Sequence, residues 1–298
     1  MKKVLSLMIM MLVILAACGG QEDSKDSGSE GKEKKELTIG VIPAQTEGEM
    51  QSAMEKLEGL LEEKMDRKVK IDTYPDYNGV VEAMNFKKID MAFFGPLTYV
   101  IANNKSGADA IITQLVDGEP FYHSYIITHK DNKFSSLEEF LNDSQEYNFA
   151  FGDPNSTSGS LIPSIELGDR DVFTDKDNHE FKTVRYTGSH DATALAVQNK
   201  QVDAGAIDSA IYDQLIESGK IDESKLKVIW KSDKLFQYPW AVNKEMDKDT
   251  KKQLQEIFVN IEDQDILDAF GASGFTKASN EDYESIKKAA IKQGVIKE

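Results

Sequence analysis

The chain has 298 residues, and 52 acidic against 35 basic side chains give it a formal net charge of −17. Such a charge repels nucleic-acid phosphates, so we expect no nucleic-acid partner. One cysteine and four histidines leave no disulfide framework and no thiolate zinc site, and we expect neither a metal nor a cofactor. At about 100–200 residues per domain, the length favours two domains.

The N-terminus is typical of an export signal. Lys2 and Lys3 precede an uncharged apolar run over residues 4–17, shorter than the roughly 20 residues needed to span a bilayer. The exit, Leu15-Ala16-Ala17-Cys18-Gly19, resembles the lipobox of bacterial lipoproteins. This implies a signal peptide over 1–17 and cleavage before Cys18. It also implies that lipid on Cys18, palmitate included, anchors the protein to the outer face of the cell membrane. An ordinary signal peptide with an incidental cysteine is the alternative.

Residues 18–35 contain no large apolar side chain after the cysteine, so we expect a flexible tether. From residue 36 onward, short apolar runs alternate with segments of helical periodicity. We expect strands at 37–42, 69–74, 91–94, 110–116, 122–128, 149–151, 183–186, 202–207 and 227–230, and a mainly helical tail over 247–298. This alternation predicts an α/β protein with parallel sheets flanked by helices, which bind ligands at the carboxyl ends of their strands.

The junction at residues 152–159, Gly-Asp-Pro-Asn-Ser-Thr-Ser-Gly, follows one expected strand and precedes an apolar segment. Free N–H groups and the positive dipole end at a helix start hold oxyanions without a lysine. Ser156, Thr157 and Ser158 add three hydroxyl groups there, and Gly159 allows close approach of a ligand. A plain Ser/Thr helix cap explains the same residues equally well.

Two further junctions carry candidate residues. His190 stands where a helix begins after Gly188, and it could donate to an anion there, although a lone histidine is more often packed or solvated. Asp208 ends an apolar strand, where an ordinary helix cap has equal weight. A hydrolase triad of Ser156 or Ser158 with His190 and Asp208 is allowed by residue type, but the nucleophile-elbow pattern Gly-x-Ser-x-Gly is absent around both serines.

Several motifs together resemble one family. They are residues 76–84 (Asp-Tyr-Asn-Gly-Val-Val-Glu-Ala-Met), 93–96 (Phe-Phe-Gly-Pro), 152–159, 188–190 (Gly-Ser-His) and 194–206. In this order they resemble the phosphonate-binding (PhnD-type) receptors of ABC importers. The resemblance implies a type II periplasmic-binding-protein fold, with two α/β lobes joined by two crossover segments and the ligand in the cleft. We place lobe 1 at 36–120 plus 231–298 and lobe 2 at 121–230.

The resemblance also implies a function for each matched position. Ser156, Thr157 and Ser158 would grip the phosphorus-bound oxygens, and His190 would donate to another oxygen. The remaining ligand contacts would be Tyr77, Phe94, Gly95 and Asp208. Some relatives carry tyrosine where this chain has Phe94, so this chain lacks one hydroxyl donor at that position. Asp208 is the best match for an acidic residue whose position varies in the family.

The implied protein is a receptor and not an enzyme. It would capture a phosphonate, phosphite or phosphate-like oxyanion as a monomer and deliver it to an ABC permease. Two alternatives stay open from the residues themselves. One is a receptor for another small ligand, such as a vitamin precursor. The other is a secreted hydrolase that uses Ser156 and His190.

Overall fold

The structure is a computed structural model that describes residues 35–45 and 49–297. The expected signal peptide at 1–17, the lipid-attachment site at Cys18 and the expected tether up to residue 34 lie outside the described residues. Within the described part, no helix combines the length and the apolar character needed to cross a membrane.

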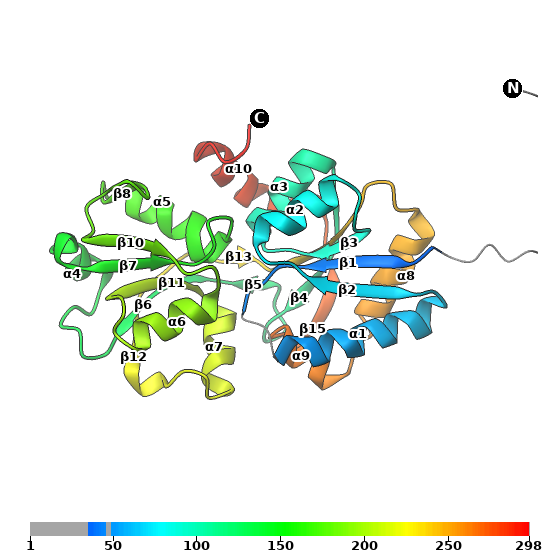
Figure 1. Ribbon diagram of the computed structural model, residues 1–298, viewed down its shortest axis with the longest axis horizontal. Helices are drawn as coiled ribbons and strands as arrows, with labels where there is room; N and C mark the ends of the chain where they lie inside the picture. Colours follow the sequence, from blue (N-terminus) through cyan, green and yellow to red (C-terminus); the bar gives the residue numbers. More distant parts are fainter. Residues whose placement is uncertain (1–34, 46–48, 298) are drawn as a thin grey trace, which may run out of the picture. The chain divides into compact units, whose positions relative to one another are not determined.

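A six-stranded sheet forms the first lobe (Figure 1). Its strands, in spatial order, are β15 (Gly274–Lys277), β4 (Asp109–Leu115), β14 (Pro239–Val242), β3 (Met91–Phe93), β1 (Leu37–Val41) and β2 (Val69–Thr73). The helices of this lobe are α1 (Glu49–Met65), α2 (Tyr77–Asn85), α3 (Pro96–Ser106), α8 (Lys248–Phe258), α9 (Gln264–Ala269) and α10 (Glu284–Lys292). Strand β1, which lies between β3 and β2, is buried along almost its whole length because helices cover both faces of the sheet.

A five-stranded sheet forms the second lobe. Its strands, in spatial order, are β10 (Thr183–Tyr186), β7 (Asn148–Phe151), β11 (Ala204–Asp208), β6 (Ser124–His129) and β12 (Leu226–Lys231). The helices of this lobe are α4 (Leu137–Leu141), α5 (Ile162–Gly168), α6 (His190–Gln198) and α7 (Ser209–Glu217), with a π-helical turn at Thr157–Leu161. A short hairpin of β8 (Phe173–Asp175) and β9 (Asn178–His179) completes it.

The chain passes between the lobes twice. Strands β5 (Phe121–Tyr122) and β13 (Leu235–Phe236) pair antiparallel and form a separate two-stranded ribbon at these crossings. The predicted α/β architecture of two lobes with two crossover segments is therefore confirmed.

The predicted parallel sheets are found only in part, because both sheets are mixed: β1 pairs parallel with β2 and β3, and β7 pairs parallel with β10 and β11. β14 runs antiparallel to β3 and β4, and β6 runs antiparallel to β11 and β12. Both β14 and β6 enter their sheet directly after a crossing, without the covering helix that a parallel connection requires. The tail expected to be mainly helical also contributes strand β15, which pairs with β4.

Each lobe has its own aromatic-rich packing. In the second lobe, Phe140, Phe149 and Phe151 are fully buried together with neighbouring phenylalanines. In the first lobe, Trp240 packs against Phe93 and Phe270. Burying a side chain of this size stabilises the fold by roughly 1.5–3 kcal/mol. Two well-packed lobes give rigid bodies whose facing ends can present functional side chains.

The two lobes repeat one local arrangement. Helix α2 leads through a tight turn into β3 and then α3, and helix α6 leads through the same kind of turn into β11 and then α7. Both first helices have nine residues, and the turns place Lys87 and Lys200 at the same positive φ of 55°. The carboxylates of Asp90 and Asp203 then accept backbone N–H groups in the first two residues of β1 and β7, from Thr38 at 3.1 Å and from Asn148 at 2.8 Å.

Candidate functional site

The candidate residues are brought together at the ends of the strands, where the two lobes face each other. In the second lobe, Ser156 caps the π-helical turn after β7, His190 opens α6, and Asp208 ends β11 and caps α7. In the first lobe, Tyr77 opens α2 and Gly95 caps α3. Every side chain among them is at most 1% exposed.

The Ser156–Ser158 segment is joined to the first lobe. The Thr157 Oγ1 atom accepts a hydrogen bond of 2.8 Å from the backbone N–H of Leu97, in the first turn of α3. The Thr98 hydroxyl donates to the Asn155 carbonyl at 3.2 Å. Because a hydroxyl group both donates and accepts, Thr157 still has its own hydrogen for another acceptor.

Gly159 leaves room for its neighbours. Its N–H donates to Ser156 Oγ at 3.0 Å. A Cβ atom at this position would lie 2.9 Å from Ser156 Oγ and 3.1 Å from His190 Cε1. The glycine therefore allows the serine hydroxyl and the imidazole ring to approach each other. The predicted close approach of a ligand at Gly159 stays a prediction.

His190 is held in one tautomer. The backbone N–H of Asp208 donates to its Nδ1 atom at 3.2 Å, so Nδ1 is the acceptor and Nε2 carries the hydrogen. Burial lowers the pKa of His190 to about 4, and nearby Asp191 only partly opposes this shift. At neutral pH the ring is therefore uncharged, and it presents an Nε2–H donor beside Ser156 Oγ (3.5 Å) and Tyr238 Oη (3.3 Å).

This tautomer excludes a catalytic triad. In a triad the carboxylate accepts a hydrogen bond from Nδ1–H of the histidine. Here Nδ1 of His190 itself accepts a bond from the backbone, so Asp208 cannot orient the ring as a triad aspartate does. Among the described residues, no group of His, Cys, Asp and Glu side chains is placed to hold a metal ion.

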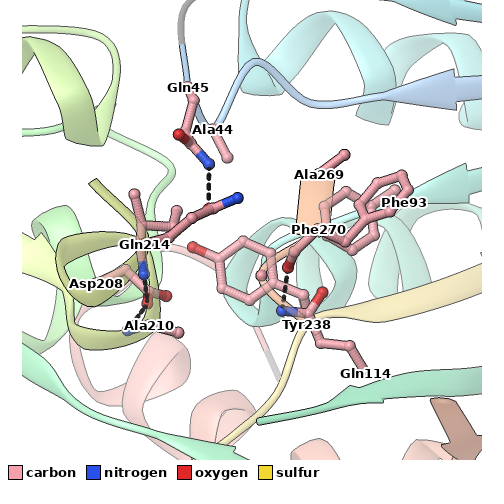
Figure 2. A pocket seen from close by; sticks show the side chains of 12 residues that line it. Ala44, Gln45, Phe93, Gln114, Asp208, Ala210, Gln214, Tyr238, Ala269 and Phe270 are labelled. Carbon is pink, nitrogen blue, oxygen red and sulfur yellow. Dashed lines mark hydrogen bonds between the residues drawn. The ribbon is translucent and has the colours of Figure 1, made fainter. Parts of the chain in front are cut away.

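The two oxygens of Asp208 differ. Oδ1 accepts the N–H groups of Ala210 at 2.7 Å and Ile211 at 3.1 Å, which makes it the cap of α7 (Figure 2). Oδ2 is buried and has no hydrogen-bond partner. Burial raises the pKa of Asp208 to about 7, although the two backbone bonds and the nearby Tyr238 hydroxyl oppose the rise. The carboxyl group is thus a helix cap and also has a free acceptor.

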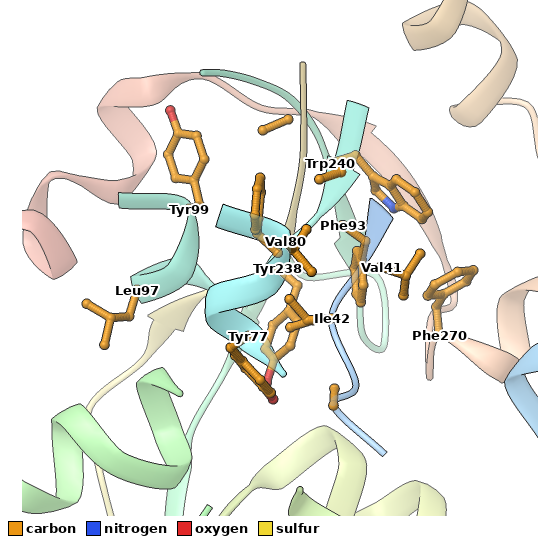
Figure 3. Close-up of a cluster of buried hydrophobic side chains, with 14 of the residues drawn as sticks. Val41, Ile42, Tyr77, Val80, Phe93, Leu97, Tyr99, Tyr238, Trp240 and Phe270 are labelled. Atoms are coloured by element: carbon orange, nitrogen blue, oxygen red, sulfur yellow. The ribbon is translucent and has the colours of Figure 1, made fainter. Parts of the chain in front are cut away.

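Two tyrosines that sequence reasoning missed also lie in the site. Tyr122 belongs to β5 on the first crossing, and Tyr238 follows β13 on the second. Their rings are 5.5 Å apart, and the Tyr238 hydroxyl reaches His190. Tyr77 and Tyr238 direct their hydroxyl groups to the same side (Figure 3). Aromatic residues beside the two predicted crossings were the signal that could have found them.

Phe94 and Gly95 occupy less polar positions. Phe94 is fully buried in the core of the first lobe, and its backbone N–H donates to the Pro239 carbonyl. It offers no side-chain hydrogen bond. Gly95 lies beside the ring of Tyr77, where a Cβ atom would be 3.7 Å from Tyr77 Cε1.

The site contains several buried oxygens without a hydrogen-bond partner. They are Tyr77 Oη, Tyr122 Oη, Ser158 Oγ and Asp208 Oδ2. Burial, followed by the charge of nearby aspartates, raises the pKa of Tyr77 and Tyr122 well above the usual range, so both remain neutral donors. A buried polar group without a partner costs about 1–3 kcal/mol. The arrangement is therefore suited to a small polar ligand that would supply the missing partners.

Comparisons with known proteins agree on one family. A family model for the periplasmic substrate-binding protein of phosphonate ABC transporters matches residues 39–283. The phosphonates-binding periplasmic protein of Escherichia coli K12 is 30% identical over 265 residues, covering 87% of this chain and 77% of that protein. The phosphate-import protein PhnD of Mycolicibacterium smegmatis is 29% identical over 254 residues, covering 83% and 78%.

Among solved structures, PhnD1 from Prochlorococcus marinus in complex with methylphosphonate has a TM-score of 0.79 and 25% identity, covering 88% of this chain and 99% of that one. The resemblance inferred from the motifs is confirmed, and with it the two-lobed type II fold. The family consists of extracytoplasmic receptors that serve a membrane permease, not of enzymes. The chain belongs to the periplasmic substrate-binding proteins of phosphonate ABC transporters.

Proposed function

We propose that this receptor captures a phosphonate, phosphite or phosphate-like oxyanion among the buried side chains between its lobes. We call these side chains the polar cluster: Tyr77, Tyr122, Ser156, Thr157, Ser158, His190, Asp208 and Tyr238. The observation that carries the proposal is the set of unpartnered buried oxygens, contributed by both lobes and by one crossing. The names of the relatives, which include a phosphonate-binding and a phosphate-import protein, support the ligand class.

The polar cluster would hold the anion with neutral donors. The hydroxyl groups of Tyr77, Tyr122 and Ser158 and the Nε2–H of His190 would each donate to a phosphorus-bound oxygen. Hydrogen bonds to a charged group are about twice as strong as those between neutral groups. Asp208 Oδ2 would accept the remaining P–O–H hydrogen, because a carboxylate can only accept. No lysine or arginine belongs to the polar cluster.

Closure of the lobes would follow from the same contacts. We propose lobe 1 at residues 36–120 plus 231–298 and lobe 2 at 121–230, which hinge at the two crossings and act as a monomer. Hydrogen bonds join them around the polar cluster, including Leu97 N–H to Thr157 and His190 N–H to the Ala44 carbonyl at 3.0 Å. The permease would recognise this closed form.

Substitutions at His190 test the proposed site. Methylphosphonate should bind to the parent in a calorimetric titration. His190→Ala should weaken binding by about tenfold or more, because a hydrogen bond to a charged group contributes about 1.5–3 kcal/mol. His190→Gln should keep part of the affinity, since its amide N–H can donate. If alanine binds better than glutamine while both variants stay folded, the histidine only fills space and the proposed role is wrong.

We also propose that Cys18 carries the lipid anchor, palmitate included, that holds the receptor on the outer face of the membrane. The cysteine is the only one in the chain, and it follows Leu15-Ala16-Ala17. Cys18→Ala should release the protein into the medium or leave the precursor uncleaved. Cell fractionation and the mass of the product measure both effects. Normal processing together with unchanged membrane association of the variant would contradict the anchor.

A further inference from the structure

A small cavity adjoins the polar cluster. Asp208 and Tyr238 line it and also belong to the polar cluster (Figure 2). A ligand held by the polar cluster would therefore lie next to this cavity. Its volume is about 20 Å³. The remaining lining side chains include Ala44, Gln45, Ala210, Gln214 and Phe270.

The wall of the cavity is apolar next to Asp208. Ala44 and Phe270 come from the first lobe, and Ala210 comes from the first turn of α7 in the second lobe. Ala210 is fixed in place because its N–H donates to Asp208 Oδ1 at 2.7 Å. The surface beside the carboxyl group therefore suits a methyl group or a hydrogen as well as a hydroxyl group.

A pair of glutamines closes the cavity across the lobes. Gln45 Nε2 donates to Gln214 Oε1 at 2.8 Å, and Gln214 Nε2 donates to the carbonyl of Asp268 at the end of α9. Gly271 lies against this amide, since a Cβ atom there would be 3.3 Å from Gln214 Oε1. Gln214 of the second lobe is thus bonded twice to the first lobe, and its side chain is fixed when the lobes are closed.

We propose that this cavity is the subsite for the substituent on phosphorus and that it admits a hydrogen, a hydroxyl or a methyl group but not a chain of two or more carbons. The inference rests on the proposed function, because it assumes that the polar cluster holds the phosphorus-bound oxygens. About 10–15 Å³ of such space accommodates one water molecule. The cavity therefore fits one group the size of a methyl, and a longer substituent must separate the Gln45–Gln214 pair.

The test compares phosphite, methylphosphonate, ethylphosphonate and propylphosphonate by calorimetric titration. Phosphite and methylphosphonate should both bind to the parent, and ethylphosphonate should bind at least about tenfold more weakly than methylphosphonate, since one extra methylene in a fitted pocket changes binding about 10–200-fold. Equal binding of all four compounds would overturn the subsite. Absence of binding by all four compounds and by phosphate, the ligand with a hydroxyl group in this position, would overturn the proposed function itself, and the subsite with it.

Two variants test whether the discrimination by substituent size arises in this cavity. Gln214→Ala removes the closing amide and should reduce the preference for methylphosphonate over ethylphosphonate by about tenfold. Ala210→Val keeps the backbone N–H but narrows the cavity, so it should weaken methylphosphonate relative to phosphite. Gln253→Ala is the matched control, because it removes a side-chain amide that donates a hydrogen bond to the Lys64 carbonyl within the first lobe. It should leave unchanged both affinity ratios, methylphosphonate to ethylphosphonate and methylphosphonate to phosphite. Unchanged ratios in both cavity variants, with normal thermal melting, would also contradict the proposal.

Discussion

Replacing Gly159 with alanine is expected to lower the affinity for methylphosphonate by at least about tenfold. The new Cβ atom would lie 2.9 Å from Ser156 Oγ, 3.1 Å from His190 Cε1 and 3.3 Å from Gly152 Cα. The contact with Ser156 Oγ is shorter than a Cβ atom tolerates and the other two are tight, so the neighbouring groups must shift, and dense packing leaves little room for them to do so. The serine hydroxyl and the imidazole must therefore separate. Loss of one hydrogen bond to the charged ligand already corresponds to about 1.5–3 kcal/mol.

Gly59→Ala is the control for this substitution. Gly59 lies in α1, and a Cβ atom there would meet no other atom within 4 Å. Alanine is favoured over glycine in a helix by about 1 kcal/mol, so this variant should melt at the same or a higher temperature and bind normally. Calorimetric titration and thermal denaturation of both variants measure the two effects. If Gly159→Ala binds as the parent does, the contact between Ser156 and His190 has no part in ligand capture.

Asp208→Asn is expected to convert rejection of sulfate into binding. In the parent, a fully ionised sulfate would face the buried carboxylate and could offer it no hydrogen. The asparagine keeps an oxygen for the N–H groups of Ala210 and Ile211, and it presents an amide donor in place of Oδ2. Sulfate should therefore bind at least about tenfold more tightly to the variant, whereas phosphite should bind about tenfold more weakly.

The pH dependence of sulfate binding provides a second check on Asp208. Its pKa of about 7 means that the carboxyl group gains a proton, and becomes a donor, as the pH falls through neutrality. The affinity of the parent for sulfate should therefore rise toward lower pH, and that of Asp208→Asn should stay constant. His190 has a pKa of about 4 and remains neutral in this range. A parent that rejects sulfate equally on both sides of pH 7, or a variant that still rejects it, would reduce Asp208 to a helix cap.

Local pattern was sufficient to predict much of the candidate site. Ser156, His190 and Asp208 each stand where a strand ends and a helix begins, and this position is readable from neighbouring residues. Tyr122 and Tyr238 could not be found in this way. Their approach to the polar cluster depends on how the lobes pack, because Tyr238 meets a histidine 48 positions away in the chain.

For the fold, too, local sequence pattern predicted the elements but not the features that depend on tertiary packing. Alternating strands and helices predicted two α/β lobes, but the direction of β6 and β14 depends on where the chain crosses between the lobes. Strand β15 is short, with only Phe275 buried, so it has no strong apolar pattern. The tautomer of His190 and the pKa of Asp208 were not predictable either, since both follow from backbone contacts and burial in the folded chain.

The repeated arrangement of the two lobes has a consequence for the orientation of the ligand. Tyr77 and His190 hold equivalent positions at the start of α2 and α6, and Gly95 and Asp208 hold equivalent positions at the start of α3 and α7. The two halves would therefore enclose the ligand with similar backbones but unlike chemistry, since the N-cap of α7 carries a carboxyl group and the equivalent N-cap of α3 is a glycine. A tetrahedral oxyanion, nearly symmetric in itself, is expected to bind in a single orientation with its protonated oxygen toward the second lobe.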